Sequence, residues 1–99
     1  MEGKWVFTET HGAQLASLEI SNQGYAKLVG KKGDKLSTSV LKEVSPGTFE
    51  LRDRYKQGIL NFEVELTLTV EGTLAGKTTL LGQDRDSKGT GQALVGKKE

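Results

Sequence analysis

The chain of 99 residues contains no cysteine, one proline, one tryptophan and one histidine. The absence of cysteine excludes disulfides, thiol catalysis and cysteine-based metal sites, although it leaves the redox compartment open. The formal net charge of +1 provides no strong field to attract nucleic acid or an anionic membrane. No apolar run approaches the roughly 20 residues of a membrane-spanning helix. The length predicts a single domain, residues 1–99, with a core of modest size.

The first five residues, Met1-Glu2-Gly3-Lys4-Trp5, lead directly into an alternating segment, and no signal peptide is visible. We therefore expect either a cytoplasmic protein or an exported one whose signal peptide has been removed from this chain. The compartment stays open between the two.

The segment Leu60–Glu71 alternates between apolar and polar residues along its whole length. Successive side chains of a strand point to opposite faces, so this pattern predicts one long strand with an apolar and a polar face. Such a strand is longer than the typical strand of about 5–6 residues. A long strand needs equally long neighbours, and a curled sheet or barrel provides them.

Shorter alternating segments occur on both sides of this strand, separated by turn residues, and the thirteen glycines are spread along the chain. Short connections predict that consecutive strands pair antiparallel. We predict an all-β fold, an eight-stranded antiparallel up-and-down barrel, with a β-sandwich as the alternative. The expected strands are Lys4–Glu9, Ala13–Ser21, Tyr25–Lys31, Lys35–Val44, Thr48–Lys56, Leu60–Glu71, Thr73–Leu81 and Thr90–Lys98.

Two short motifs resemble those of known small barrels. Gly3-Lys4-Trp5 resembles the Gly-x-Trp start of lipocalin-like proteins, and the Gly-x-Leu-x-Gly stretch Gly72–Gly76 resembles strand starts of avidin- and lipocalin-like (calycin-type) barrels. The resemblance implies that Trp5 packs across the closed end of the barrel. The chain is shorter than a full lipocalin and lacks its C-terminal helix. Its single tryptophan argues against biotin, because avidins line their pocket with several. Small barrels of this kind also include bacterial peptidase inhibitors.

Several residues suggest chemistry at first sight, but their spacing argues against it. His11 is the only histidine, with no partner set for catalysis or metal binding. Asp84–Gly89 imitates half a calcium loop, with Lys88 where an oxygen ligand is needed. Gly76-Lys77-Thr78 lies inside a strand, at the wrong spacing for a phosphate-binding loop. We therefore predict that the chain is not an enzyme and that it uses no cofactor and no metal.

Four lysines cluster around one predicted turn, at Lys27, Lys31, Lys32 and Lys35. Nucleic-acid interfaces of this kind interleave aromatic side chains with the cations, and none occurs here. We expect no nucleic-acid partner and no membrane span.

Asp53 is the informative exception in the alternation. The register of Thr48–Lys56 points it inward between Leu51 and Tyr55, where a buried carboxylate costs several kcal/mol unless it is paired. One interpretation is a carboxylate at an open rim or satisfied by Tyr55, Thr38 or Thr78. The other is a polar anchor in a ligand pocket, since pockets are mostly apolar with a few polar groups. The candidate ligand-binding residues are Asp53, Tyr55, Phe49, Leu51, Phe62, Thr38 and Thr78, with Val64 and Leu66 along the same wall.

Our expected function is non-enzymatic binding of a small, largely apolar ligand in the barrel interior. The alternative is a protein-interaction module or peptidase inhibitor that acts through rim loops and has a filled interior. The two functions require different interior volumes, because eight strands enclose a lumen that side chains can fill or that can hold one small ligand.

Overall fold

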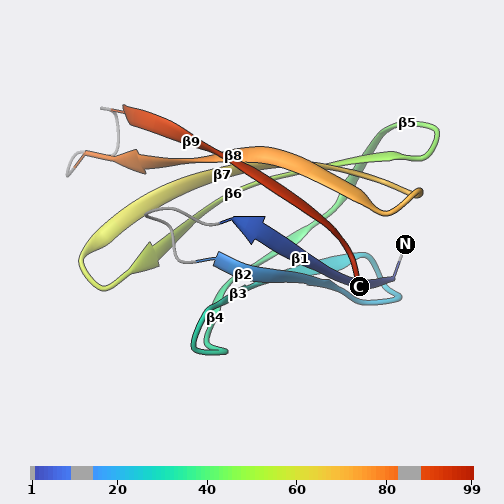
Figure 1. The fold of residues 1–99 in the computed structure, drawn as a ribbon, viewed down its shortest axis with the longest axis horizontal. Helices are drawn as coiled ribbons and strands as arrows, with labels where there is room; N and C mark the ends of the chain where they lie inside the picture. The colour runs from blue at the N-terminus through green and yellow to red at the C-terminus, as the bar shows by residue number, and fades with distance from the viewer. Residues whose placement is uncertain (1, 10–14, 83–87) are drawn as a thin grey trace.

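The computed structural model describes residues 2–9, 15–82 and 88–99, which contain nine strands and no helix. His11 and Asp84–Ser87 lie outside the described residues. All nine strands belong to one antiparallel sheet (Figure 1). Within the described part of the chain, no helix is long and apolar enough to cross a membrane. The strands are β1 (Gly3–Glu9), β2 (Leu15–Ile20), β3 (Tyr25–Gly30), β4 (Lys35–Val40), β5 (Lys42–Ser45), β6 (Thr48–Gln57), β7 (Leu60–Thr69), β8 (Thr73–Leu81) and β9 (Lys88–Lys98).

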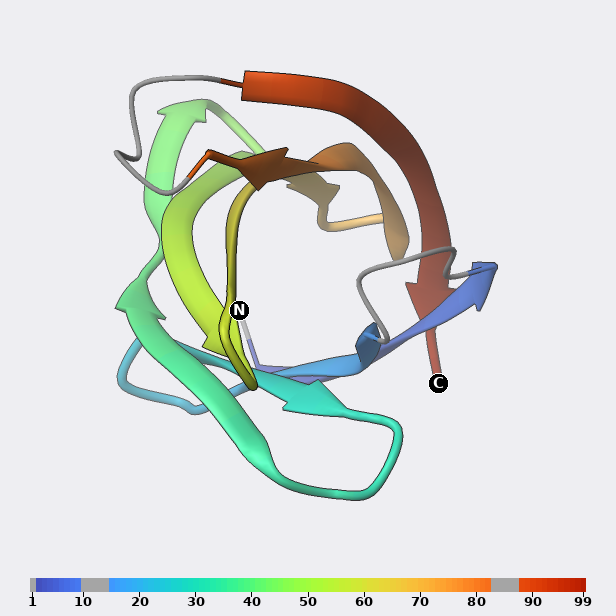
Figure 2. The same cartoon turned by 90° about the vertical axis from the view of Figure 1, so that its left-hand side faces the viewer.

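The sheet curls into a nearly closed up-and-down barrel, and Figure 2 shows the strands arranged in a ring. The hydrogen-bonded order is β4-β3-β2-β1-β9-β8-β7-β6-β5. The two edge strands, β4 and β5, are consecutive in the chain and are joined by Leu41 alone. The covalent chain therefore closes the ring where the ladder stops, and β4 also contacts β6 across this seam. The predicted barrel class is confirmed, and the sandwich alternative is not adopted.

The predicted strand count of eight is wrong by one, because the expected strand Lys35–Val44 divides at Leu41. Its first half pairs with β3 and its second half pairs with β6. A strand that changes partner must bend, and the N–H of Leu41 instead donates to the carbonyl of Gly24 at 3.1 Å. The alternation of apolar and polar residues in Lys35–Val44 does not indicate this change of partner.

The strand that dominates the sequence, β7, is paired along its length with β6 and β8. Its apolar residues from Phe62 to Leu68 are buried and alternate with more exposed polar ones. The expected strand ran to Glu71, but it ends at Thr69, and Val70 is 66% exposed in the turn that follows.

Side chains from both halves of the barrel form one continuous core. The ten largest fully buried side chains are each less than 2% exposed. Because these side chains are almost fully shielded from solvent and belong to one cluster, the inward faces of the strands fill the middle of the barrel. These ten are Trp5, Leu15, Leu18, Leu28, Leu51, Val64, Leu66, Leu68, Leu74 and Leu94.

The inward face of β4 differs from the expectation. The register shifts by one residue between Leu28 and Val29, which leaves Leu36 as an extra residue in β4. An extra residue of this kind flips the side chains that follow it to the other face. Thr38 consequently pairs with Lys27 on the outer face and is exposed, so its expected inward position is wrong.

One end of the barrel is formed where β4 and β7 begin and β6 and β8 end. We call this end the mouth. The hairpin between β6 and β7 closes with the two-residue loop Gly58-Ile59, and Gly58 adopts φ +62°. A positive φ at this position is one that glycine tolerates without strain. The tight turn therefore brings Lys56 and Asn61 opposite one another at the mouth.

Candidate functional site

The mouth carries a pocket of about 240 Å³ that opens to solvent between β4 and the β6–β7 hairpin. We call it the mouth pocket. Its wall combines two leucines and an aromatic ring with two cationic side chains and one amide, so it can contact an apolar group and a polar group at once. The described residues that line it are Leu36, Arg54, Tyr55, Lys56, Asn61 and Leu81.

Tyr55 forms the floor of the pocket and is 5% exposed. Its ring stacks on Phe62, with ring centroids 5.3 Å apart and an interplanar angle of 17°. The Tyr55 hydroxyl and the buried Thr78 hydroxyl share a hydrogen bond of 3.2 Å. The structure thus brings together three of the expected site residues, Tyr55, Phe62 and Thr78, in one cluster.

Burial raises the pKa of Tyr55 from 10.0 to about 12, an effect that the hydrogen bond from Thr78 partly offsets. A raised pKa means that the folded chain holds the proton more tightly than the unfolded chain. The contribution of Tyr55 to the free energy of unfolding is therefore fully present below pH 10. It falls as the pH rises from 10 towards 12, by at most about 1.4 kcal/mol per pH unit.

We expect Tyr55→Phe to flatten the decline in unfolding free energy between pH 10 and 12. Urea denaturation at several pH values, followed by circular dichroism, measures this slope. Tyr25→Phe is the matched control, because Tyr25 is 51% exposed on the outer face. Equal slopes for Tyr55→Phe and the wild-type chain would show that Tyr55 does not cause the decline.

Asp53 lies on the inward side of β6, where its cross-strand partner is the fully buried Val64. The expected register is therefore correct, although Asp53 is only half-buried. Its carboxylate accepts a hydrogen bond of 2.8 Å from the backbone N–H of Arg54, and not from any of the three side chains considered in the sequence. β5 pairs with β6 only from Thr48 to Glu50. The N–H of Arg54 lies beyond the end of that ladder, and the Asp53 carboxylate supplies its hydrogen-bond acceptor.

The two cations of the mouth pocket differ in their surroundings. The Arg54 guanidinium lies 3.4 Å from a carboxylate oxygen of Glu63. Lys56 is exposed and has no ion-pair partner among the described residues, and its cross-strand neighbour is the neutral Asn61. Lys56 is thus the positive charge of this pocket that remains available to a ligand.

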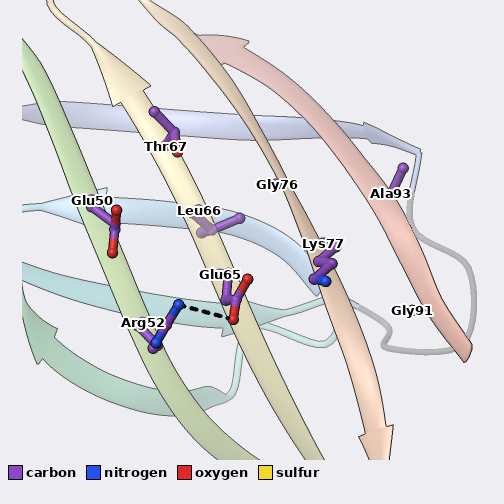
Figure 3. Close-up of a pocket in the computed structure, with 9 residues that line it drawn as sticks. All are labelled: Glu50, Arg52, Glu65, Leu66, Thr67, Gly76, Lys77, Gly91 and Ala93. Carbon is purple, nitrogen blue, oxygen red and sulfur yellow. Dashed lines mark ion pairs between the residues drawn. The ribbon is translucent and has the colours of Figure 1, made fainter. Parts of the chain in front are cut away.

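A larger hollow of about 510 Å³ lies on the outer face of β6 to β9, and we call it the outer groove (Figure 3). Arg52, Glu65 and Lys77 are successive cross-strand partners across it. Arg52 lies 3.3 Å from a Glu65 oxygen, and Glu50 adds a second carboxylate. The charges of the groove therefore offset one another, and Gly76 and Gly91 line it without a side chain.

Of the described residues expected at the site, Tyr55 alone lines the mouth pocket, and Phe62 and Thr78 contact it through the ring stack and the hydroxyl hydrogen bond. Leu51 is 1% exposed and belongs to the core. Phe49 is six residues from Tyr55, about 20 Å along the strand, and lies near the other end of β6. Thr38 is on the outer face, as described above. The expected site residues therefore do not all line one pocket.

Sequence reasoning missed most of the actual lining. Arg54 and Lys56 alternate with the inward-facing Asp53 and Tyr55 and so lie on the outer side of β6, but their place at the end of the strand brings them to the rim of the pocket. The signal that could have found them is Gly58, which marks the turn after the strand and hence the mouth. Leu36 lies at the β4 register shift, which no residue pattern announces.

Within the described part of the chain, no group of three or more His, Asp or Glu side chains is placed to hold a metal ion. No family model, curated protein or solved structure matches this chain. The interpretation of the mouth pocket therefore depends on its own geometry.

Proposed function

We propose that this chain is a non-enzymatic binding protein that takes a small amphipathic ligand at the mouth of the barrel. The observation that supports this proposal is the mouth pocket, whose wall places Leu36, Leu81 and the Tyr55 ring beside Lys56 and Asn61. Binding sites for small molecules commonly combine an apolar surface with a few placed polar groups.

The packed core favours a ligand at the mouth over one in the barrel interior. Side chains such as Leu51, Val64 and Leu66 are 0–1% exposed, so a ligand in the lumen would have to displace them. Displacement of close-packed core side chains costs several kcal/mol, whereas the mouth pocket is already open to solvent.

The lipocalin-like resemblance of Gly3-Lys4-Trp5 agrees with this function, since up-and-down barrels of that type bind ligands from one open end. The barrel class supports the resemblance at the level of architecture. Membership of the lipocalin or calycin group remains part of the proposal.

Titration of the isotope-labelled protein with small amphipathic molecules, followed in amide correlation spectra, tests the proposal. We expect the largest shifts at Leu36, Tyr55, Asn61 and Leu81. Leu36→Trp should fill the pocket and lower the affinity at least tenfold.

The matched control is Ile59→Trp, because Ile59 lies at the same end of the barrel and is 90% exposed. This variant should bind as the wild-type chain does. Shifts centred on Lys77 and Ala93, or binding that survives Leu36→Trp, would place the ligand elsewhere and refute the proposal.

A second candidate is the protein-interaction module, and the free edge of β5 favours it. All four residues of β5 are exposed, and the strand has a ladder partner, β6, on one side only. An exposed, unpaired strand edge is a template for a strand of another chain. On this alternative, substitution of Val44 with proline should abolish association with the partner, measured by calorimetry, while ligand titrations of the mouth remain silent.

A further inference from the structure

We infer that the ligand of the mouth pocket is a small organic carboxylate with an apolar body, held with its negative end beside Lys56 and Asn61. This inference rests on the proposed function, because it names the ligand class for the same pocket. It follows from the charge, the polarity and the size of the wall.

The charge of the wall is positive. Among the described lining residues, Arg54 and Lys56 are cationic and none is a carboxylate. Glu63 lies 3.4 Å from Arg54 and offsets that charge, which leaves Lys56. Tyr55 is neutral at neutral pH, as a tyrosine of ordinary pKa already is, so it adds no negative charge to the floor.

The position of Asp53 fixes the orientation of the ligand. Its carboxylate bonds to the N–H of Arg54 on the inward side of β6, and it would repel a second carboxylate placed beside it. Lys56 lies three residues further along the strand, about 10 Å towards the mouth. The negative end of the ligand therefore belongs at Lys56, where the Asn61 amide can donate a hydrogen bond.

The apolar part of the wall determines the body of the ligand. Leu36, Leu81 and the ring of Tyr55 offer hydrocarbon surface, and the Tyr55 hydroxyl is already engaged with Thr78. The volume of about 240 Å³ equals the space of about eight liquid water molecules. A branched or single-ring body with one carboxylate fits this space, whereas a long-chain lipid does not.

The outer groove differs from the mouth pocket in its balance of charge. Its cations Arg52 and Lys77 face Glu50 and Glu65, so an anion gains no net attraction there. Lys77 is consequently a suitable control position for experiments that change the charge of Lys56.

The test compares 4-methylpentanoate with its neutral isostere 4-methylpentanamide in amide correlation spectra of the full chain. We expect both to shift Leu36 and Leu81 and the carboxylate to bind about fivefold more tightly, the upper range of an exposed ion pair. Lys56→Gln should reduce the affinity for the carboxylate to that for the amide, Lys56→Arg should largely restore it, and Lys77→Gln should leave it unchanged.

The outcomes separate this inference from the proposed function. Equal affinity for acid and amide at the mouth overturns the carboxylate inference and leaves the proposed function standing. The absence of binding by either molecule overturns both. A third titration with acetyl-Gly-Gly-Leu distinguishes the source of the carboxylate: tighter binding than that of 4-methylpentanoate assigns it to a polypeptide C terminus, and weaker binding assigns it to a free small acid.

Discussion

Replacement of Gly76 with alanine should largely unfold the barrel. A Cβ added to Gly76 would overlap the backbone carbonyl oxygen of Glu65 and lie 2.9 Å from the Cα of Leu66. Both neighbours are backbone atoms of β7, so they cannot rotate away, and relief requires that the β7–β8 ladder separate at its centre. We expect a loss of about 4 kcal/mol or more, a large part of the stability of a small domain. Urea denaturation followed by circular dichroism measures this loss.

Gly91→Ala is the matched control in the neighbouring strand. The Cβ added there would meet the side-chain oxygen of Thr79 at 3.1 Å, and that side chain can adjust its rotamer. We expect a change of about 0.5 kcal/mol or less, typical of an exposed substitution. If Gly76→Ala unfolded at the same urea concentration as Gly91→Ala, the close approach of β8 to β7 would not exist in solution.

The role of Gly76 illustrates a limit of the sequence pattern. In the sequence, the stretch Gly72–Gly76 indicated only the start of a strand. The structure separates its two glycines, because Gly72 adopts a positive φ of 97° in a turn whereas Gly76 permits contact between two backbones. A glycine inside a strand marks either a bend or a close approach. The neighbour that approaches is known only once the strands have been paired.

Alternation predicted the inward and outward faces well wherever a strand kept one register. In β7 the apolar residues from Phe62 to Leu68 are buried as expected, and Asp53 faces inward on β6 as expected. In β4 the prediction was wrong for Thr38, because one extra residue near Leu36 inverts the pattern. The sequence Ser-Thr-Ser around Thr38 has no strong preference for either face, so nothing local could have corrected the register.

The candidate site was only partly predictable for a different reason. Tyr55, Phe62 and Thr78 were chosen because they face inward, and they do meet. Whether inward side chains surround a cavity or fill it depends on how their volumes fit together, which periodicity does not describe. Here leucines from many strands fill the lumen, and the open space lies at the strand ends, beside Arg54 and Lys56.

Trp5→Ala should produce the second large effect. The indole of Trp5 is 1% exposed within the core and belongs to β1, between β2 and β9. Removal of a large buried aromatic side chain costs about 3–5 kcal/mol, because apolar contacts are lost and a cavity remains. In the wild-type chain, the fluorescence of Trp5 should be blue-shifted and poorly quenched by iodide. An emission maximum equal to that of the unfolded chain would show that the indole is exposed and would remove the main support for the lipocalin-like resemblance.

Two variants separate the causes of this effect. Trp5→Phe should cost less than Trp5→Ala, because it keeps an aromatic ring and removes the Nε1–H, which is buried and has no hydrogen-bond partner among the described residues. The Lys98 ammonium lies 5.5 Å from the centroid of the indole, so Lys98→Ala should cost only about 0.5–1 kcal/mol, the range of an exposed cation–π contact. Lys98→Ala should also increase the quenching of Trp5 fluorescence by iodide, since the Lys98 side chain lies over the indole ring. If Lys98→Ala leaves the quenching unchanged, neighbouring strands alone bury the indole.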